Sequence, residues 1–176
     1  MQNNLRNNVE FGAQIVIAIA VLVVAGVVVK RHVFPKPANP RNVTRISKGE
    51  QLNLHDVDFR QNKKTLVFFL NKDCRYCTLS APVYRQLTEE AFKQNVKTVA
   101  VFPNLPEEAK EYLQSIKLPI ADIRTGSLSS YKIDGTPTVL LVNSSGAVEK
   151  VWFGDASRRE KEIREEFVSL AENHTD

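Results

Sequence analysis

Cysteine is scarce in this chain: there are two among 176 residues, and they stand three positions apart, at Cys74 and Cys77. Neither can close a long loop with a distant partner, which excludes a structural disulfide framework and leaves a local redox or metal pair. A zinc site needs four ligands, and the histidines lie elsewhere in the chain, at His32, His55 and His174. A haem attachment site needs histidine directly after the second cysteine, where a threonine stands. Two buried, inert cysteines are the remaining alternative to a redox-active pair. We expect a redox-active disulfide, with no metal and no other cofactor, because the pair stands between a strand pattern and a helix pattern.

The excess of positive over negative charge is also small: 24 Lys and Arg stand against 20 Asp and Glu, which gives a formal net charge of +4. Much of the positive charge follows a long apolar run, at Lys30, Arg31, Lys36, Arg41, Arg45 and Lys48. Such a cluster is more typical of contact with lipid headgroups or solvent than of a nucleic-acid groove. The composition therefore predicts no nucleic-acid partner.

The apolar run covers residues 11–29, and Gln14 is its only strongly polar side chain. A helix of about 20 residues is long enough to cross the hydrocarbon core of a bilayer. A cleaved signal peptide normally has a shorter apolar region and a small-residue cleavage site, whereas this run ends in Val27-Val-Val-Lys30. We expect residues 11–29 to be an uncleaved single-pass anchor in the lipid bilayer, preceded by a polar tail at 1–10.

The orientation of this anchor rests on two opposing arguments. Catalytic cysteine pairs with a lone anchor work where disulfides persist, which places the domain outside the cytoplasm, in the periplasm, at the cell membrane. The positive-inside rule favours the opposite orientation, because Lys30 and Arg31 follow the run while Arg6 precedes it. We keep the extracytoplasmic placement as the expectation, together with a redox partner in the membrane.

A tether and one folded domain follow the anchor. Residues 30–49 contain three prolines, Pro35, Pro37 and Pro40, and lack apolar periodicity, which predicts an extended linker. The folded domain is expected over residues 50–176.

The domain alternates apolar strand patterns with amphipathic helix patterns. Asn104 and Glu107 form a predicted capping box for the second helix, and Asp155 is the predicted cap of the last helix. Helices between strands imply a parallel part of the sheet, and the final hairpin adds an antiparallel edge. The predicted fold is three-layer α/β, with a mixed sheet and helices on both faces. The expected strands are 65–70, 96–102, 120–123, 138–142 and 147–153, and the expected helices are 77–92, 105–116, a turn at 128–132 and 156–172.

The cysteine pair stands between the first buried strand and the first long helix. The N-terminus of a helix favours an anion through its unpaired N–H groups and its dipole, so a Cys74 thiolate would be stabilised there. Arg75 and Lys72 add positive charge, and together these effects predict a lowered Cys74 pKa. Cys77, one turn further on, is predicted to be more buried and to act as the resolving thiol.

A second motif, Gly135-Thr136-Pro137-Thr138, directly precedes an apolar strand. Combined with the strand–CxxC–helix pattern it resembles the thioredoxin superfamily over residues 50–172. The resemblance implies a thioredoxin-like fold in which Pro137 is cis and faces the disulfide. It also implies that Thr136 pairs with the substrate backbone. Tyr76 resembles the tyrosine in the active-site pair of glutaredoxins, and we assign it to substrate binding.

Cys74 and Pro137 are 63 positions apart, which is similar to the membrane-anchored branch that acts in cytochrome maturation and extracytoplasmic thiol exchange. Some residues depart from the family pattern. Asp73 replaces a frequent tryptophan, the strand 65–70 has no acidic residue, and Ser80 stands where that branch often has glutamate. The sequence therefore shows no obvious carboxylate that would take the proton of the buried thiol. Asp73 or water is left for that role.

The sequence predicts a thiol–disulfide oxidoreductase that acts on protein substrates at the membrane. A redoxin-type peroxidase is one alternative, but such enzymes need Pro and Thr or Ser before the reactive cysteine, and residues 69–73 do not match. A non-catalytic interaction domain and a copper chaperone are further alternatives, and the latter would require a histidine near the pair. The direction of electron flow stays open, because oxidases, reductases and isomerases share these motifs.

Overall fold

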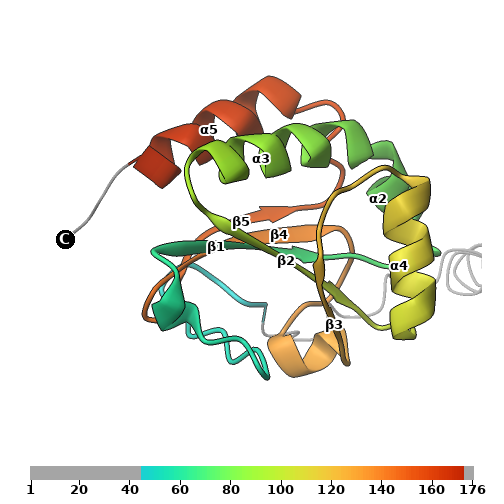
Figure 1. Cartoon of the computed structure of the whole chain (residues 1–176), viewed down its shortest axis with the longest axis horizontal. Helices are drawn as coiled ribbons and strands as arrows, with labels where there is room; N and C mark the ends of the chain where they lie inside the picture. Colours follow the sequence, from blue (N-terminus) through green and yellow to red (C-terminus); the bar gives the residue numbers. More distant parts are fainter. Residues whose placement is uncertain (1–44, 173–176) are drawn as a thin grey trace, which may run out of the picture. The chain divides into compact units, whose positions relative to one another are not determined.

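Five strands form one mixed sheet in the computed structural model, which describes residues 45–172 (Figure 1). The order across the sheet is β3-β2-β1-β4-β5. β1, β2 and β3 run parallel to one another, whereas β4 is antiparallel to both β1 and β5. The predicted parallel part and antiparallel edge are therefore both present. The strands are β1 (Lys64–Phe69), β2 (Lys97–Phe102), β3 (Asp122–Thr125), β4 (Thr138–Asn143) and β5 (Val148–Phe153).

The helices surround this sheet unevenly. α3 and α5 lie side by side across one face (Figure 1), and α4 follows β2. The helices are α2 (Arg75–Leu79), α3 (Ala81–Lys93), α4 (Pro106–Ser115) and α5 (Glu160–Glu172), with short 3-10 helices η1 (Phe59–Gln61) and η2 (Leu128–Tyr131).

Successive strand residues point to opposite faces, which gives the domain two hydrophobic cores. Leu66 and Phe68 belong to the first core, which also takes buried residues from α3, α4 and α5. Val67 and Phe69 belong to the second core, on the other face. That face is covered by residues 46–59 and the η2 region rather than by a long helix of residues 45–172. We expected three layers with helices on both faces of the sheet. The structure has long helices on one face, and the other face has a thinner cover.

The expected helix at 77–92 is divided in two at Ser80. Pro82 stands in the first turn of α3, where its missing N–H costs no helical hydrogen bond. α2 thus ends at Leu79, whose side chain is 44% exposed and lies outside the core.

Two predicted helix caps lie at other positions. The N–H of Leu105 donates to Glu108 Oε2 at 3.3 Å, so the capping residues of α4 follow the predicted Asn104 and Glu107 by one position. α5 begins at Glu160, and Asp155 instead accepts the N–H of Ser157 at 2.9 Å in the turn before it. Local sequence patterns therefore predicted both helices but not the residues at which they begin.

The folded domain begins before residue 50 and includes the last residues of the predicted tether. Ile46 is buried, and its N–H donates to the carbonyl oxygen of Lys132 at 3.1 Å. The predicted tail at 1–10, the anchor at 11–29 and the tether up to residue 44 lie outside the described residues. Within residues 45–172, no helix combines the length and the apolar character needed to cross a bilayer.

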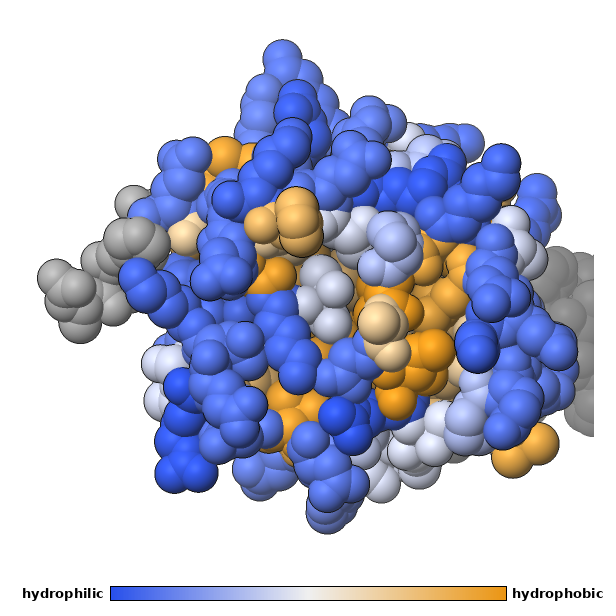
Figure 2. Space-filling model, viewed as in Figure 1, coloured by the Kyte–Doolittle hydropathy of each residue, from blue (hydrophilic) through white to orange (hydrophobic). Residues whose placement is uncertain are grey.

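An open groove between α4 and β3 carries apolar residues on one face of the domain. Figure 2 shows it as an orange hollow bordered by blue surface. Its lining includes Leu113, Leu118, Pro119, Ile120 and Ile123, together with Lys110 and Lys117. The groove shares α4 with the cysteine site described below.

Candidate active site

Cys74 and Cys77 stand at the junction of β1 and α2 and are joined by a disulfide, with their Cα atoms 5.3 Å apart. Cys74 is the N-cap residue of α2, with extended backbone (φ −89°, ψ 105°). Its side chain is partly exposed, whereas Cys77 is fully buried. Cys77 is therefore the more buried of the two cysteines, as the sequence predicted.

Two backbone groups contact the outer sulfur. The N–H of Cys77 donates to Cys74 Sγ at 3.1 Å, as expected for a capping atom at a helix N-terminus. The carbonyl oxygen of Thr136 lies 3.3 Å from the same sulfur, and the Thr136–Pro137 peptide is cis. The structure thus brings together the cysteine pair and the Thr136–Pro137 segment. The assignment of Thr136, Pro137 and Tyr76 to substrate binding stays a prediction.

Strand pairing explains why these distant segments meet. β4 is antiparallel to β1, and Thr138 at the start of β4 pairs with Phe69 at the end of β1. The residues before β4 and those after β1 therefore lie at the same edge of the sheet. The N–H of Gly154 donates to the carbonyl oxygen of Pro137 at 2.9 Å, and Thr138 Oγ1 donates to Gly135 O at 2.7 Å. These bonds fix the loop beside the disulfide.

The predicted electrostatic partners of Cys74 differ in their surroundings. Lys72 Nζ lies 2.6 Å from a carboxylate oxygen of Glu108 on α4. This contact raises the pKa of Lys72 and lowers that of Glu108, so the lysine charge is offset by a carboxylate. Arg75 is exposed and has no hydrogen-bonded or ionic partner within residues 45–172. Tyr76 is 54% exposed beside it.

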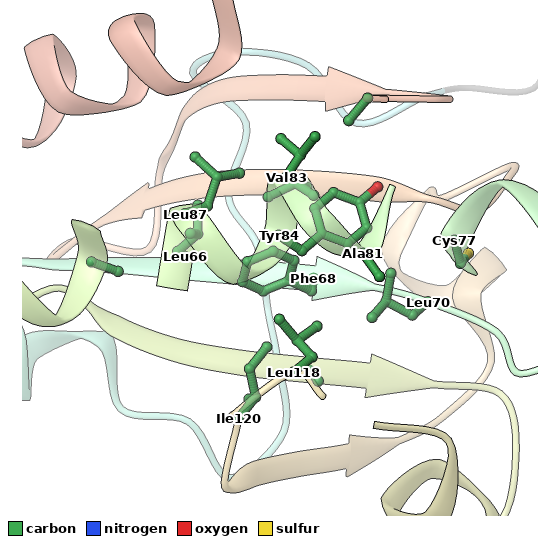
Figure 3. Packing of buried hydrophobic residues seen from close by; sticks show 14 of the residues in the cluster. Leu66, Phe68, Leu70, Cys77, Ala81, Val83, Tyr84, Leu87, Leu118 and Ile120 are labelled. Atoms are coloured by element: carbon green, nitrogen blue, oxygen red, sulfur yellow. The ribbon is translucent and has the colours of Figure 1, made fainter. Parts of the chain in front are cut away.

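The inner cysteine lies at one end of the first hydrophobic core. Figure 3 shows Cys77, Ala81 and Tyr84 along the helical segment that covers Phe68 and Leu70. Such a site is closed to water, because every one of these side chains is at most 3% exposed.

A buried hydroxyl follows Cys77 by one helical turn. Ser80 is fully buried; its Oγ donates to Asp155 Oδ1 at 3.2 Å and accepts the N–H of Ala156 at 2.9 Å. The Tyr84 hydroxyl shares a hydrogen bond with Ser80, while burial raises the pKa of Tyr84. This pair cannot be predicted from the sequence, because Ser80 and Asp155 are 75 positions apart and no local pattern links them.

α4 contacts the active-site helix through a pair of hydroxyls. Thr78 Oγ1 and Tyr112 Oη lie 3.1 Å apart, and Lys72 N donates to Asn104 Oδ1 at 3.2 Å in front of α4.

Among residues 45–172, no group of three His, Cys, Asp or Glu side chains is placed to hold a metal ion.

Comparison with known proteins agrees with this geometry. The model of the AhpC/TSA family matches residues 36–151, which is more than half of the chain. The chain belongs to the AhpC/TSA family. This match confirms the predicted place in the thioredoxin-like superfamily.

Individual relatives of this AhpC/TSA-family chain carry different activities in their names. A thioredoxin-like protein of Haemophilus influenzae is 27% identical over 129 residues, which cover 72% of this chain and 74% of that protein. A thiol:disulfide interchange protein from Bacteroides sp. has 21% identity and a TM-score of 0.53, covering 72% of this chain and 88% of that one. Peroxidoxin BcpB from Mycobacterium tuberculosis has 11% identity and a TM-score of 0.56, covering 73% and 100%. The two solved structures show a shared fold.

Family, fold and cysteine pair together make this member of the AhpC/TSA family a thioredoxin-like thiol–disulfide oxidoreductase. The disulfide between Cys74 and Cys77 is its redox group, and the direction of electron flow is a separate question.

Proposed function

We propose that the chain exchanges thiols and disulfides with protein substrates, with Cys74 as the nucleophile and Cys77 as the resolving thiol. One observation carries this assignment: the outer sulfur is reachable and lies 3.3 Å from the Thr136 carbonyl beside a cis-proline, while the inner sulfur is buried. In the reduced pair, Cys74 attacks a substrate disulfide and forms a mixed disulfide. Cys77 then attacks Cys74 and releases the substrate thiol.

Substrate proteins have a surface to dock on around the outer sulfur. Tyr76 is half exposed on one side of Cys74, and Phe153 is 44% exposed on β5, opposite Thr138. The ring of Phe153 lies over Gly135, where an added Cβ would come within 3.2 Å of it. Exposed aromatic rings beside a reactive group favour extended polypeptide over small thiols as the substrate class.

A peroxidase is the competing function, and the AhpC/TSA family match gives it a specific basis. The segment 69–73 in front of Cys74 contains neither proline nor threonine nor serine, so it lacks the residues that such an activity needs. Peroxide consumption by the reduced chain tests this directly. We expect none above the rate of free thiols.

The membrane location is part of the proposal. The apolar run 11–29 would hold the domain at the cell membrane, with the cysteine pair outside the cytoplasm, where disulfides persist. A redox partner in the membrane would then return the pair to its starting state. Labelling intact cells with a membrane-impermeant maleimide after mild reduction tests this orientation, because a cytoplasmic domain stays unlabelled.

The activity is tested by reduction of insulin disulfides with the full chain and dithiothreitol. Cys74→Ser is expected to abolish the activity. Cys77→Ser is expected to retain the first step and to accumulate a mixed disulfide, visible as a mass increase that a reductant removes. If Cys74→Ser retains activity, or if Cys77→Ser forms no adduct, the assigned roles are wrong.

A further inference from the structure

We propose that Ser80 and Asp155 form the route by which the buried Cys77 thiol exchanges its proton with water. This inference rests on the proposed function, in which Cys77 must become a thiolate to resolve the mixed disulfide. It concerns two residues that act through Cys77 and not on the substrate.

Burial makes proton loss from Cys77 a problem for the domain. The side chain is fully buried in the first core, among apolar residues such as Leu70 and Ala81. A thiolate is the attacking species, so a proton must leave the core during each cycle. Water has no direct access to take it.

Ser80 is the polar side chain placed to accept that proton. It follows Cys77 by three positions, and the helical turn continues through it, since its N–H donates to Tyr76 O at 3.0 Å. Residues three apart on a helix are neighbours on the same side. Two residues of α3 carry other buried hydroxyls, Thr88 and Tyr84. That of Thr88 donates to Arg85 O at 2.8 Å and is committed to its own helix, whereas that of Tyr84 is hydrogen-bonded to Ser80 itself.

Asp155 continues the route to solvent. Its Oδ1 accepts the Ser80 hydroxyl at 3.2 Å, and its side chain is only partly buried. Ser157, through its backbone N–H and its hydroxyl, and then Ser80 hold the pKa of Asp155 below its usual value, so the group is a carboxylate at neutral pH. The titratable groups that face it are Tyr84, from α3, and Arg158, from its own turn.

The step balances without any further reactant. The Cys77 thiol gives its proton to the Ser80 oxygen as the Ser80 proton moves to Asp155, and Asp155 returns it to water. The Cys77 thiolate attacks Cys74 Sγ, a new disulfide forms, and the bond between Cys74 and the substrate sulfur breaks. The substrate sulfur leaves with the electron pair as a thiolate, so the enzyme pair is oxidised and the substrate disulfide is reduced. The reverse reaction follows the same route in the other direction.

The test separates the two steps with 5,5′-dithiobis(2-nitrobenzoate) and the reduced full chain in stopped flow. Attack by Cys74 releases one coloured thiolate, and resolution by Cys77 releases the second. We expect Ser80→Ala and Asp155→Asn to slow the second phase about 100-fold at pH 7, within the range of general acid–base catalysis. The first phase stays unchanged. The deficit closes as pH rises, because hydroxide then takes the proton.

Matched variants separate proton transfer from a structural effect. Ser80→Thr keeps the hydroxyl and is expected to restore the second phase. Asp155→Asn keeps an acceptor for Ser157 and removes only the charge. Thr88→Ala removes another buried hydroxyl, two turns further along in α3, and is expected to leave both phases unchanged.

Several results would overturn the route. A normal second phase in both Ser80→Ala and Asp155→Asn rules it out, as does equal slowing by Thr88→Ala. Slowing by Asp73→Asn but not by Asp155→Asn assigns the proton to the exposed carboxylate that the sequence suggested. A wild-type chain without a first phase that depends on Cys74 overturns the proposed function itself, and the route with it. A normal first phase with an insensitive second phase overturns the route alone.

Discussion

Replacing Phe68 by alanine tests how strongly the sheet supports the active-site helix. Phe68 is fully buried at the centre of β1, between Ala100 on β2 and Val139 on β4. Its ring meets that of Tyr84 on α3 edge to face, with the ring centres 5.5 Å apart. Truncation of a phenylalanine in such a core removes its burial and leaves a cavity, which costs about 3–5 kcal/mol.

That cost is large against the total stability of a domain, about 5–15 kcal/mol. We expect Phe68→Ala to lower the free energy of unfolding by about 4 kcal/mol and the melting temperature by roughly 10–20 °C. Urea unfolding measures the free energy and thermal unfolding measures the melting temperature, each followed by circular dichroism on the oxidised wild type and the oxidised variant.

Phe92 supplies a control with the same chemistry. It lies on α3, like the helix partner of Phe68, but is 87% exposed. Phe92→Ala therefore creates no cavity and places a better helix former in the same helix, so the stability should change by less than about 0.5 kcal/mol. The reasoning is refuted if Phe68→Ala costs less than about 1 kcal/mol, or if the two variants lose equal stability.

Other parts of the domain give further predictions. Burial alone would raise the pKa of Asp122, but hydrogen bonds from two cations lower it overall. Its contribution to stability, about 1 kcal/mol, should therefore be present at pH 7 and disappear as pH falls through the lowered folded-state pKa, so chemical unfolding of wild type and Asp122→Asn converges in acid. Trp152→Phe loses the bond from Nε1 to Glu166 at 2.8 Å and part of a buried ring, and thermal unfolding should show a loss of about 1–2 kcal/mol. Arg45→Ala removes an exposed ion pair and a cation–π contact 4.4 Å from the Phe153 ring, and urea titration should show a loss below about 1 kcal/mol that shrinks at high salt.

Much of the fold follows from short-range patterns in the sequence. The strands at 64–69 and 138–143 are apolar runs buried on both faces, so their composition identifies them without any alternation. The start of α5 could not be placed in the same way. Asp155 has the residue type of a helix cap, but it forms a turn with Ser157, and the helix begins five positions later. Cap chemistry marks a turn at the end of a strand as readily as it marks a helix.

The active site divides between local and distant contacts. The position of Cys74 and the burial of Cys77 follow from a strand that leads directly into a helix, a pattern that spans about ten residues. The pairing of Lys72 with Glu108 crosses 36 positions, and the link from Ser80 to Asp155 crosses 75. Neither can be found by periodicity, because each depends on how α4 and the β5–α5 turn pack against the active-site helix.

These distant contacts also change the expected redox behaviour. The sequence placed two cations beside Cys74, but Lys72 is paired with Glu108, which leaves Arg75 as the one without a partner among residues 45–172. The N–H of Cys77 favours a thiolate at Cys74, whereas the Thr136 carbonyl at 3.3 Å favours the protonated thiol.

Weaker stabilisation of the thiolate means weaker stabilisation of the reduced form, and so a stronger reductant. We therefore predict a reduction potential nearer the thioredoxin value of about −270 mV than the about −120 mV of a strong oxidant, measured by equilibration with dithiol buffers. Glu108→Gln frees the lysine charge and should raise the potential, and an unchanged or lower value would contradict this account.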